Sequence, residues 1–100
     1  MNQIERITKM EAILDNAKSV FQDLENSLAR YEEIRKDLRT LDRYYSSEQW
    51  MKDYTADEEG RLPKDLKRGI LAEDALFDLF EQEREIALAC LEVTRSFIIG

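Results

Sequence analysis

The sequence predicts an all-α protein, in which a long N-terminal helix packs antiparallel with a C-terminal helix through a short helical middle segment. Residues 1–59 contain neither glycine nor proline, the two strongest helix breakers. Their apolar residues recur at alternating steps of three and four, which is the spacing of one helix face. The internal helix breakers, Gly60, Pro63 and Gly69, all fall within one ten-residue window. The pattern therefore indicates a helical hairpin or bundle with one interruption.

The first helix is expected over about residues 3–44. Its apolar stripe has the a/d spacing of a coiled coil and consists of Ile7, Met10, Leu14, Ala17, Phe21, Leu24, Leu28 and Tyr31. Ile34 follows after an extra step of three, a stammer that overwinds the pairing without ending the helix. Ile13 and Val20 widen the stripe, as in a bundle. Asn2 and Glu5 have the spacing of a helix-capping pair.

The middle segment is expected to contain a short helix over about 47–57, capped by Ser46 or Ser47. A single helical turn is expected over about 63–67, beginning with the proline and ended by Gly69. A last helix is expected over about 72–98. Its apolar stripe broadly repeats the three-and-four spacing through Leu76, Leu79, Glu83, Ile86, Cys90, Val93 and Phe97, in which Cys90 is expected to be a core residue.

Helix length predicts a partner for this single domain of residues 1–100. At about 1.5 Å per residue the first helix would span about 60 Å and the last about 40 Å. The shorter helix cannot cover the whole stripe of the longer one, and a large exposed apolar patch is rare in monomers. We therefore expect a homodimer.

Composition narrows the class of protein. The net charge of −7 argues against nucleic-acid binding, and no apolar run is long enough to span a membrane. A row of Arg35, Arg39 and Arg43 is interpreted as a solvated face paired with neighbouring carboxylates, with a docking patch for an acidic partner as the alternative. The N-terminus lacks a secretory pattern, and the lone Cys90 fits a reducing compartment, so we expect a cytoplasmic protein.

No catalytic, cofactor or metal site is predicted. The chain has no histidine and one cysteine, which leaves neither a zinc site of the usual kind nor a His-activated nucleophile. The acidic stretch 53–59 and the mainly basic stretch 60–68 are expected to neutralise one another across a turn. The alternative, a divalent cation held by Asp57, Glu58 and Glu59, lacks the ligand spacing of a calcium loop.

Four aromatic residues, Tyr44, Tyr45, Trp50 and Tyr54, are concentrated in eleven positions. They predict a small aromatic cluster that closes one end of the helical pair. The alternative is a groove for a partner, in which Tyr45 and Trp50 are anchors and Arg68 binds a partner carboxylate. We favour an internal role for Arg68, as a lock on the turn, and its candidate partners are Asp53, Glu73 and Asp74.

A known family contains similar strings. They are Tyr44-Tyr45-Ser46-Ser47-Glu48-Gln49-Trp50 followed by Asp53, then Leu62-Pro63, and Arg68-Gly69-Ile70-Leu71-Ala72-Glu73-Asp74-Ala75. With Arg6-Ile7, Met10-Glu11 and Leu14, they resemble the small bacterial family catalogued as domain of unknown function 4298, mainly from low-GC Gram-positive bacteria. The chain departs from that family's pattern at Ala72, where a serine would cap the last helix. The resemblance supports the fold and implies no activity, cofactor or catalytic residue.

Three functions are compatible with the sequence. The first is a cytoplasmic protein-interaction or scaffold module, acting as a homodimer through its helix stripe or its aromatic and basic middle. The second is a regulatory or enzymatic domain that binds a small ligand or divalent metal with carboxylates around Asp53, Glu73 and Asp74. The third is an acidic partner that docks onto a basic protein.

Overall fold

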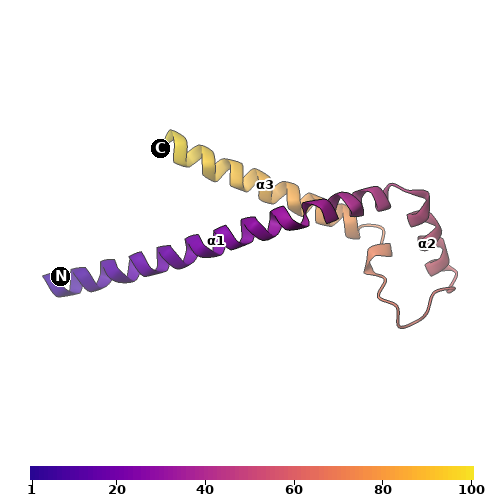
Figure 1. The fold of residues 1–100 in the computed structure, drawn as a ribbon, viewed down its shortest axis with the longest axis horizontal. Helices are drawn as coiled ribbons and strands as arrows, with labels where there is room; N and C mark the ends of the chain where they lie inside the picture. The colour runs from indigo at the N-terminus through magenta and orange to yellow at the C-terminus, as the bar shows by residue number, and fades with distance from the viewer. The chain divides into compact units, whose positions relative to one another are not determined.

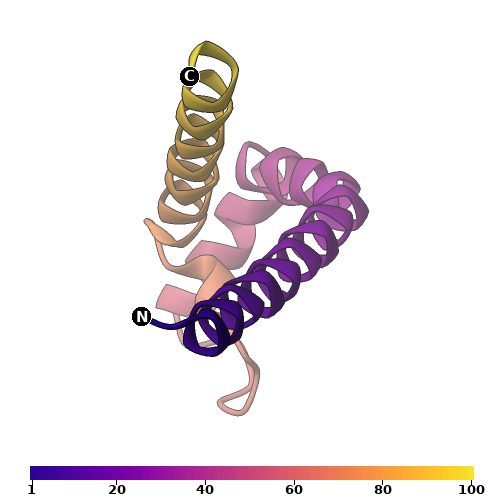
Figure 2. The same cartoon turned by 90° about the vertical axis from the view of Figure 1, so that its left-hand side faces the viewer.

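The protein is an all-α chain in the computed structural model, which describes residues 1–100 (Figure 1). Its elements are α1 (Gln3–Tyr45), α2 (Glu48–Glu58), the 3₁₀ helix η1 (Gly69–Leu71) and α3 (Ala75–Ile99). Helices account for 82% of the residues, and the chain has no strand. The predicted all-α class, with two long helices and a short one between them, is confirmed. Two views show α1 as one continuous helix (Figures 1 and 2).

The segment between α2 and α3 differs from the expectation. A hydrogen bond from the Leu66 N–H to the Pro63 carbonyl, 3.2 Å, closes a turn within 63–67, but the helical turn proper is η1, which begins at Gly69. The last helix begins at Ala75, three residues later than expected. Ala72 has extended backbone angles (φ −67°, ψ 133°) and lacks a side chain that could cap a helix at that point.

The chain divides into two compact units, unit 1 (Met1–Leu38) and unit 2 (Arg39–Gly100). Unit 1 is the N-terminal part of α1. Its start is capped as expected, because the Asn2 side-chain oxygen accepts from the Glu5 N–H at 2.8 Å. Glu5 accepts in return from the Asn2 side-chain amide at 3.0 Å. The single domain and the antiparallel packing of the two long helices stay predictions.

Unit 2 has a small core of its own. Its buried apolar residues come one each from α2, η1 and α3: Trp50, Leu71 and Leu76. The α2 helix begins behind Ser47, whose hydroxyl accepts from the Trp50 N–H at 3.3 Å and donates to the Tyr44 carbonyl at 2.6 Å. Ser47, and not Ser46, is therefore the cap. This cap places Trp50 in the first turn of α2, facing η1.

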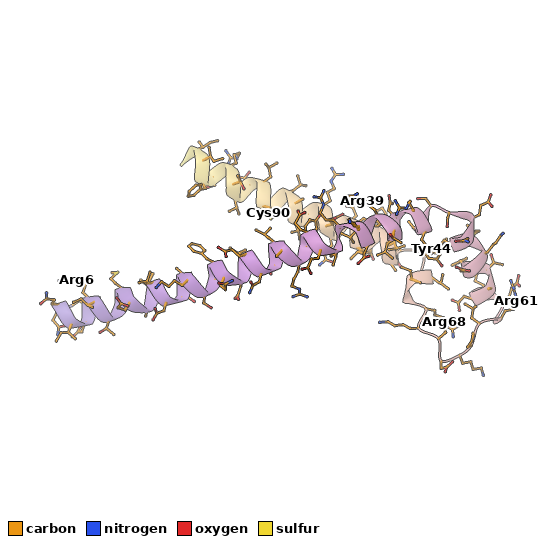
Figure 3. All side chains as sticks on the ribbon, in the orientation of Figure 1. Arg6, Arg39, Tyr44, Arg61, Arg68 and Cys90 are labelled. Carbon is orange, nitrogen blue, oxygen red and sulfur yellow. The ribbon has the colours of Figure 1, made fainter.

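Most large apolar side chains outside this core are exposed, and others, such as Leu41 and Phe80, are partly buried. No residue of α1 is buried, and Leu76, in the first turn of α3, is the buried residue of that helix. The expectation that Cys90 is a core residue is wrong, since it is exposed (Figure 3). It lies almost four turns beyond Leu76, where no other element of unit 2 packs against α3. None of the helices is long and apolar enough to cross a membrane.

Candidate functional site

Trp50 is the centre of a cluster of aromatic side chains. Its ring meets the Tyr45 ring edge to face at a centroid distance of 5.2 Å, and it stacks on the Tyr54 ring at 5.2 Å with 20° between the planes. Its indole N–H donates to the Ile70 carbonyl at 3.1 Å, which ties α2 to η1. Three of the four residues of the predicted aromatic cluster, Tyr45, Trp50 and Tyr54, are therefore in ring contact. Because Trp50 is only 8% exposed, it is a structural residue and not an anchor available to a partner.

The tyrosine hydroxyls connect the end of α1 to the rest of unit 2. Tyr44 donates to the Asp53 carboxylate at 2.6 Å, and Tyr45 donates to the Glu73 carbonyl at 2.9 Å. Partial burial, together with the hydrogen bond to Asp53 and the charge of that carboxylate, raises the pKa of Tyr44 to about 12. The phenol therefore keeps its proton, and its hydrogen bond, through the neutral range.

Tyr54 lies between two carboxylates. Its hydroxyl is 2.7 Å from a Glu73 oxygen and 2.8 Å from a Glu58 oxygen. The hydrogen bond to Glu73, followed by that to Glu58, raises the pKa of the Tyr54 phenol strongly. A phenol has one proton, so Tyr54 donates to one of these carboxylates at a time. The contact links α2 to the residue that precedes α3 by two positions.

Arg68 is the lock on the connecting loop, but its partner is not among those expected. Its guanidinium is 2.6 Å from Asp57, and both side chains are about 70% buried, with exposed fractions of 30% and 27%. It also donates to the Pro63 carbonyl at 2.5 Å and to the Leu66 carbonyl at 3.3 Å. The three bonds close the loop onto the last turn of α2. Figure 3 shows the Arg68 side chain on this loop.

The residues proposed as a ligand site do not converge. Asp53 binds Tyr44, Glu73 binds Tyr54, and Arg68 binds Asp57. Asp74 precedes α3 at the cap position and makes no side-chain capping bond. The carboxylates of the acidic run are likewise directed to separate partners, and no group of three His, Cys, Asp or Glu side chains is placed to hold a metal ion. The geometry supports a structural role for this region.

The opposed charges of the middle segment do pair. Besides Arg68 and Asp57, Arg61 lies 2.8 Å from Glu59, with both side chains more than half exposed. In the arginine row of α1, Arg35 pairs with Glu32 at 3.5 Å, and Arg43 donates to the Thr40 hydroxyl at 3.5 Å. Ion pairs this exposed contribute little to stability. A hollow beside α2, lined by Met51, Lys52, Thr55 and Arg61, is open to solvent, and its two charged lining residues are both basic.

Sequence patterns missed two features of this unit. In the sequence, Asp57 belongs to an acidic run that does not single it out as the partner of Arg68. In the fold it lies in the last turn of α2, where it can reach the loop that returns past that turn. The backbone acceptors at Pro63, Leu66 and Ile70 carry no residue-type signal. What the sequence does contain is the proline and glycine that make the loop turn back.

The exposed apolar rows are the remaining candidate surface. On α1 they comprise Ile4, Ile7, Met10, Ile13, Leu14, Val20, Phe21, Leu24, Leu28, Tyr31 and Ile34, each between 38% and 76% exposed. On α3 they comprise Phe77, Leu79, Ile86, Leu88, Leu91, Val93, Phe97, Ile98 and Ile99. Such rows are larger than the apolar patches typical of monomers.

Residues 7–93 match the family model described as Domain of unknown function (DUF4298), so the chain belongs to that family. The match confirms the resemblance expected from the strings around Trp50 and Arg68. Searches of curated proteins and of solved structures find no match. The family assigns no activity, so the function has to be argued from the residues themselves.

Proposed function

We propose that the protein is a cytoplasmic protein-interaction module that forms a homodimer through the apolar faces of α1 and α3. The observation that carries the proposal is the length of these faces, which continue for most of both helices while the buried core is limited to Trp50, Leu71 and Leu76. A helix with a continuous apolar face gains most of its stability by burying that face. The lone Cys90 fits a reducing compartment.

The α3 helix supports the proposal because it has two apolar faces. One comprises Leu79, Ile86, Val93 and Phe97, and the other comprises Phe77, Leu88, Leu91 and Ile98. At about 100° per residue, the second set is centred about 155° around the helix from the first. One neighbouring helix cannot cover both faces. A second copy supplies two further helices of the kind needed.

Unit 2 supports the proposal in a different way. The hydrogen bonds of Trp50, Tyr45 and Arg68 are directed inward, to carbonyls and carboxylates of the same unit. They fix the positions of α2, η1 and the start of α3. Unit 2 therefore acts as a rigid support from which α3 extends.

Sedimentation of the full chain over a range of concentrations tests the proposal. We expect a mass near twice 11.8 kDa that falls toward the monomer on dilution. Leu14→Glu should raise the dissociation constant at least about 100-fold. Burying one leucine is worth about 2 kcal/mol, the change occurs once in each copy, and a tenfold change in affinity corresponds to about 1.4 kcal/mol.

Ala12→Glu is the matched control. Ala12 is exposed in the same turn of α1 but lies on the face opposite the stripe, so this variant should dimerise like the wild type. A mass of 11.8 kDa at every concentration would contradict the proposal. Equal weakening by both substitutions would show that the stripe is not the contact surface.

A further inference from the structure

We infer that the two copies pair through unit 1 in antiparallel orientation, with Met10 of one α1 opposite Leu28 of the second copy. The inference rests on the proposed homodimer and specifies its occupant, orientation and register. Its evidence lies entirely within Met1–Leu38, a unit in which no residue is buried and whose stripe residues, Ala17 apart, are exposed.

The rows that flank the stripe indicate the orientation. One flanking row consists of the residues directly before the a positions of the stripe (residues 7, 14, 21 and 28). It contains Arg6, Ile13, Val20 and Ser27, and it is apolar at its centre. The row on the other flank is charged and contains Glu11, Lys18, Glu25 and Glu32. In a parallel pair, the apolar row of one helix faces the charged row of the other helix, which would place Ile13 and Val20 beside charges. In an antiparallel pair, the apolar rows of the two helices face each other, and so do the two charged rows. The apolar flanks then extend the buried face, and the charged flanks stay in water.

The stripe itself indicates the register. When Met10 faces Leu28 of the second copy, the other stripe residues also pair, each once: Ile7 with Tyr31, Leu14 with Leu24, and Ala17 with Phe21. The two-fold axis then passes between the two helices at the level of Ser19, with Val20 of both copies beside it on one side and Lys18 of both copies on the other. All eight residues before the stammer are used, so this register buries the most stripe surface.

Side-chain size agrees with this arrangement. The smallest stripe residue, Ala17, meets the bulky Phe21, so adjacent layers fill similar volumes. A parallel pair in register would place Phe21 against Phe21 and Ala17 against Ala17. One layer would be crowded and another would contain a gap, and both faults destabilise a close-packed interface.

The competing occupant of this face is α3. It is 25 residues long, against the 43 of α1, and its stripe contains Glu83 at a position that the first stripe fills with an apolar residue. The stammer at Ile34 also ends the regular stripe where the self-paired segment ends, at Tyr31. Both observations favour a second α1 over α3.

Disulfide trapping in the full chain tests the inference. In a Cys90→Ser background, which removes the exposed native thiol, Met10→Cys and Leu28→Cys are oxidised singly and after refolding together. In the inferred register, equivalent positions on the two copies are offset by about 27 Å along the helix, at 1.5 Å per residue. A disulfide requires Cα atoms within about 7 Å. We therefore expect a covalent dimer from the mixture and none from either variant alone. Leu14→Cys mixed with Leu24→Cys should behave in the same way.

Sedimentation of each reduced variant separates the possible failures. A covalent dimer from Met10→Cys alone would show parallel pairing and overturn the inference while leaving the homodimer intact. A reduced dimer that gives no covalent product in either mixture would overturn the register, including the case in which α3 occupies the stripe. A wild type that is monomeric at every concentration would overturn the homodimer and the inference together.

Discussion

The two units of this chain are stabilised in different ways. In unit 1, side-chain hydrogen bonds such as those of Asn2 with Glu5 and Gln22 with Asn26 join residues three or four positions apart. In unit 2 they join residues 28, 20 and 19 positions apart, from Tyr45 to Glu73, Trp50 to Ile70 and Tyr54 to Glu73. The contacts of unit 2 therefore specify a tertiary structure within that unit.

This difference separates helix formation from tertiary folding. A sequence without helix breakers, with a capped start, suffices to make unit 1 helical, but an isolated helix has little stability in water. Unit 2 contains the chain's glycine and proline turns, its tryptophan and its half-buried ion pair, and it fixes a structure around three buried side chains. We therefore expect unit 2 to lose its structure when its own contacts are removed, and unit 1 to depend on association.

Among the substitutions that test this difference between the units, Leu76→Ala is expected to have the largest effect on stability. Leu76 is 2% exposed, and truncation of a buried leucine lowers the free energy of unfolding by about 3 kcal/mol. Trp50 is the only tryptophan, so its fluorescence reports on unit 2 alone. Urea titration should show an earlier Trp50 transition in the variant.

Phe77→Ala is the control for Leu76→Ala, because Phe77 is the next residue of α3 and is 59% exposed. It should leave the Trp50 transition in place and weaken dimerisation instead. If both substitutions shifted the Trp50 transition equally, the distinction between a specified core and an unpartnered face would be lost.

Arg68→Ala is expected to have the next largest effect. The substitution leaves Asp57 without its ion pair and removes the donor to the Pro63 and Leu66 carbonyls. Loss of this partly buried ion pair, together with two hydrogen bonds from a charged donor, should lower the stability of unit 2 by about 2 kcal/mol. Arg61→Ala, which removes an exposed pair with Glu59, should change it by less than about 0.5 kcal/mol. The Trp50 urea transition measures both, and equal effects would argue against the lock.

How much the sequence predicts also differs between the units. The start of α1 and its stripe follow from local patterns: the Asn2 cap, the absence of breakers and the spacing from Ile7 to Tyr31. These depend on neighbours within one or two turns. In unit 2 the aromatic cluster was predictable from composition, because large aromatic residues close in sequence tend to gather in a core. The partner of Arg68 was not, since it depends on how the loop after α2 returns.

The start of α3 illustrates the same limit. Periodicity extends the helix to residue 72, but Ala72 is extended and Glu73 is held by Tyr45 and Tyr54 outside the helix. A tertiary contact has displaced a local preference, and a pattern read along the chain does not contain that contact. The exposure of Cys90 has a similar origin, because the pattern marks an apolar face without saying what covers it.

The smallest effect is expected from Tyr44→Phe, and its dependence on pH identifies its cause. The pKa of Tyr44 is raised from 10.0 in the unfolded chain to about 12 in the fold, where the phenol is partly buried and donates to Asp53. A group whose pKa is raised by folding contributes its stabilisation fully below its unfolded pKa and loses it as the pH approaches the folded value. The wild type should thus be more stable than Tyr44→Phe by about 1 kcal/mol up to pH 10, and this difference should vanish toward pH 12.

Urea titrations of both proteins at pH 8, 10 and 11 measure the difference, and because Tyr54 titrates in both, its contribution cancels. A difference that stayed constant with pH would mean that the Tyr44 hydroxyl does not stabilise unit 2 through the proton that it donates to Asp53.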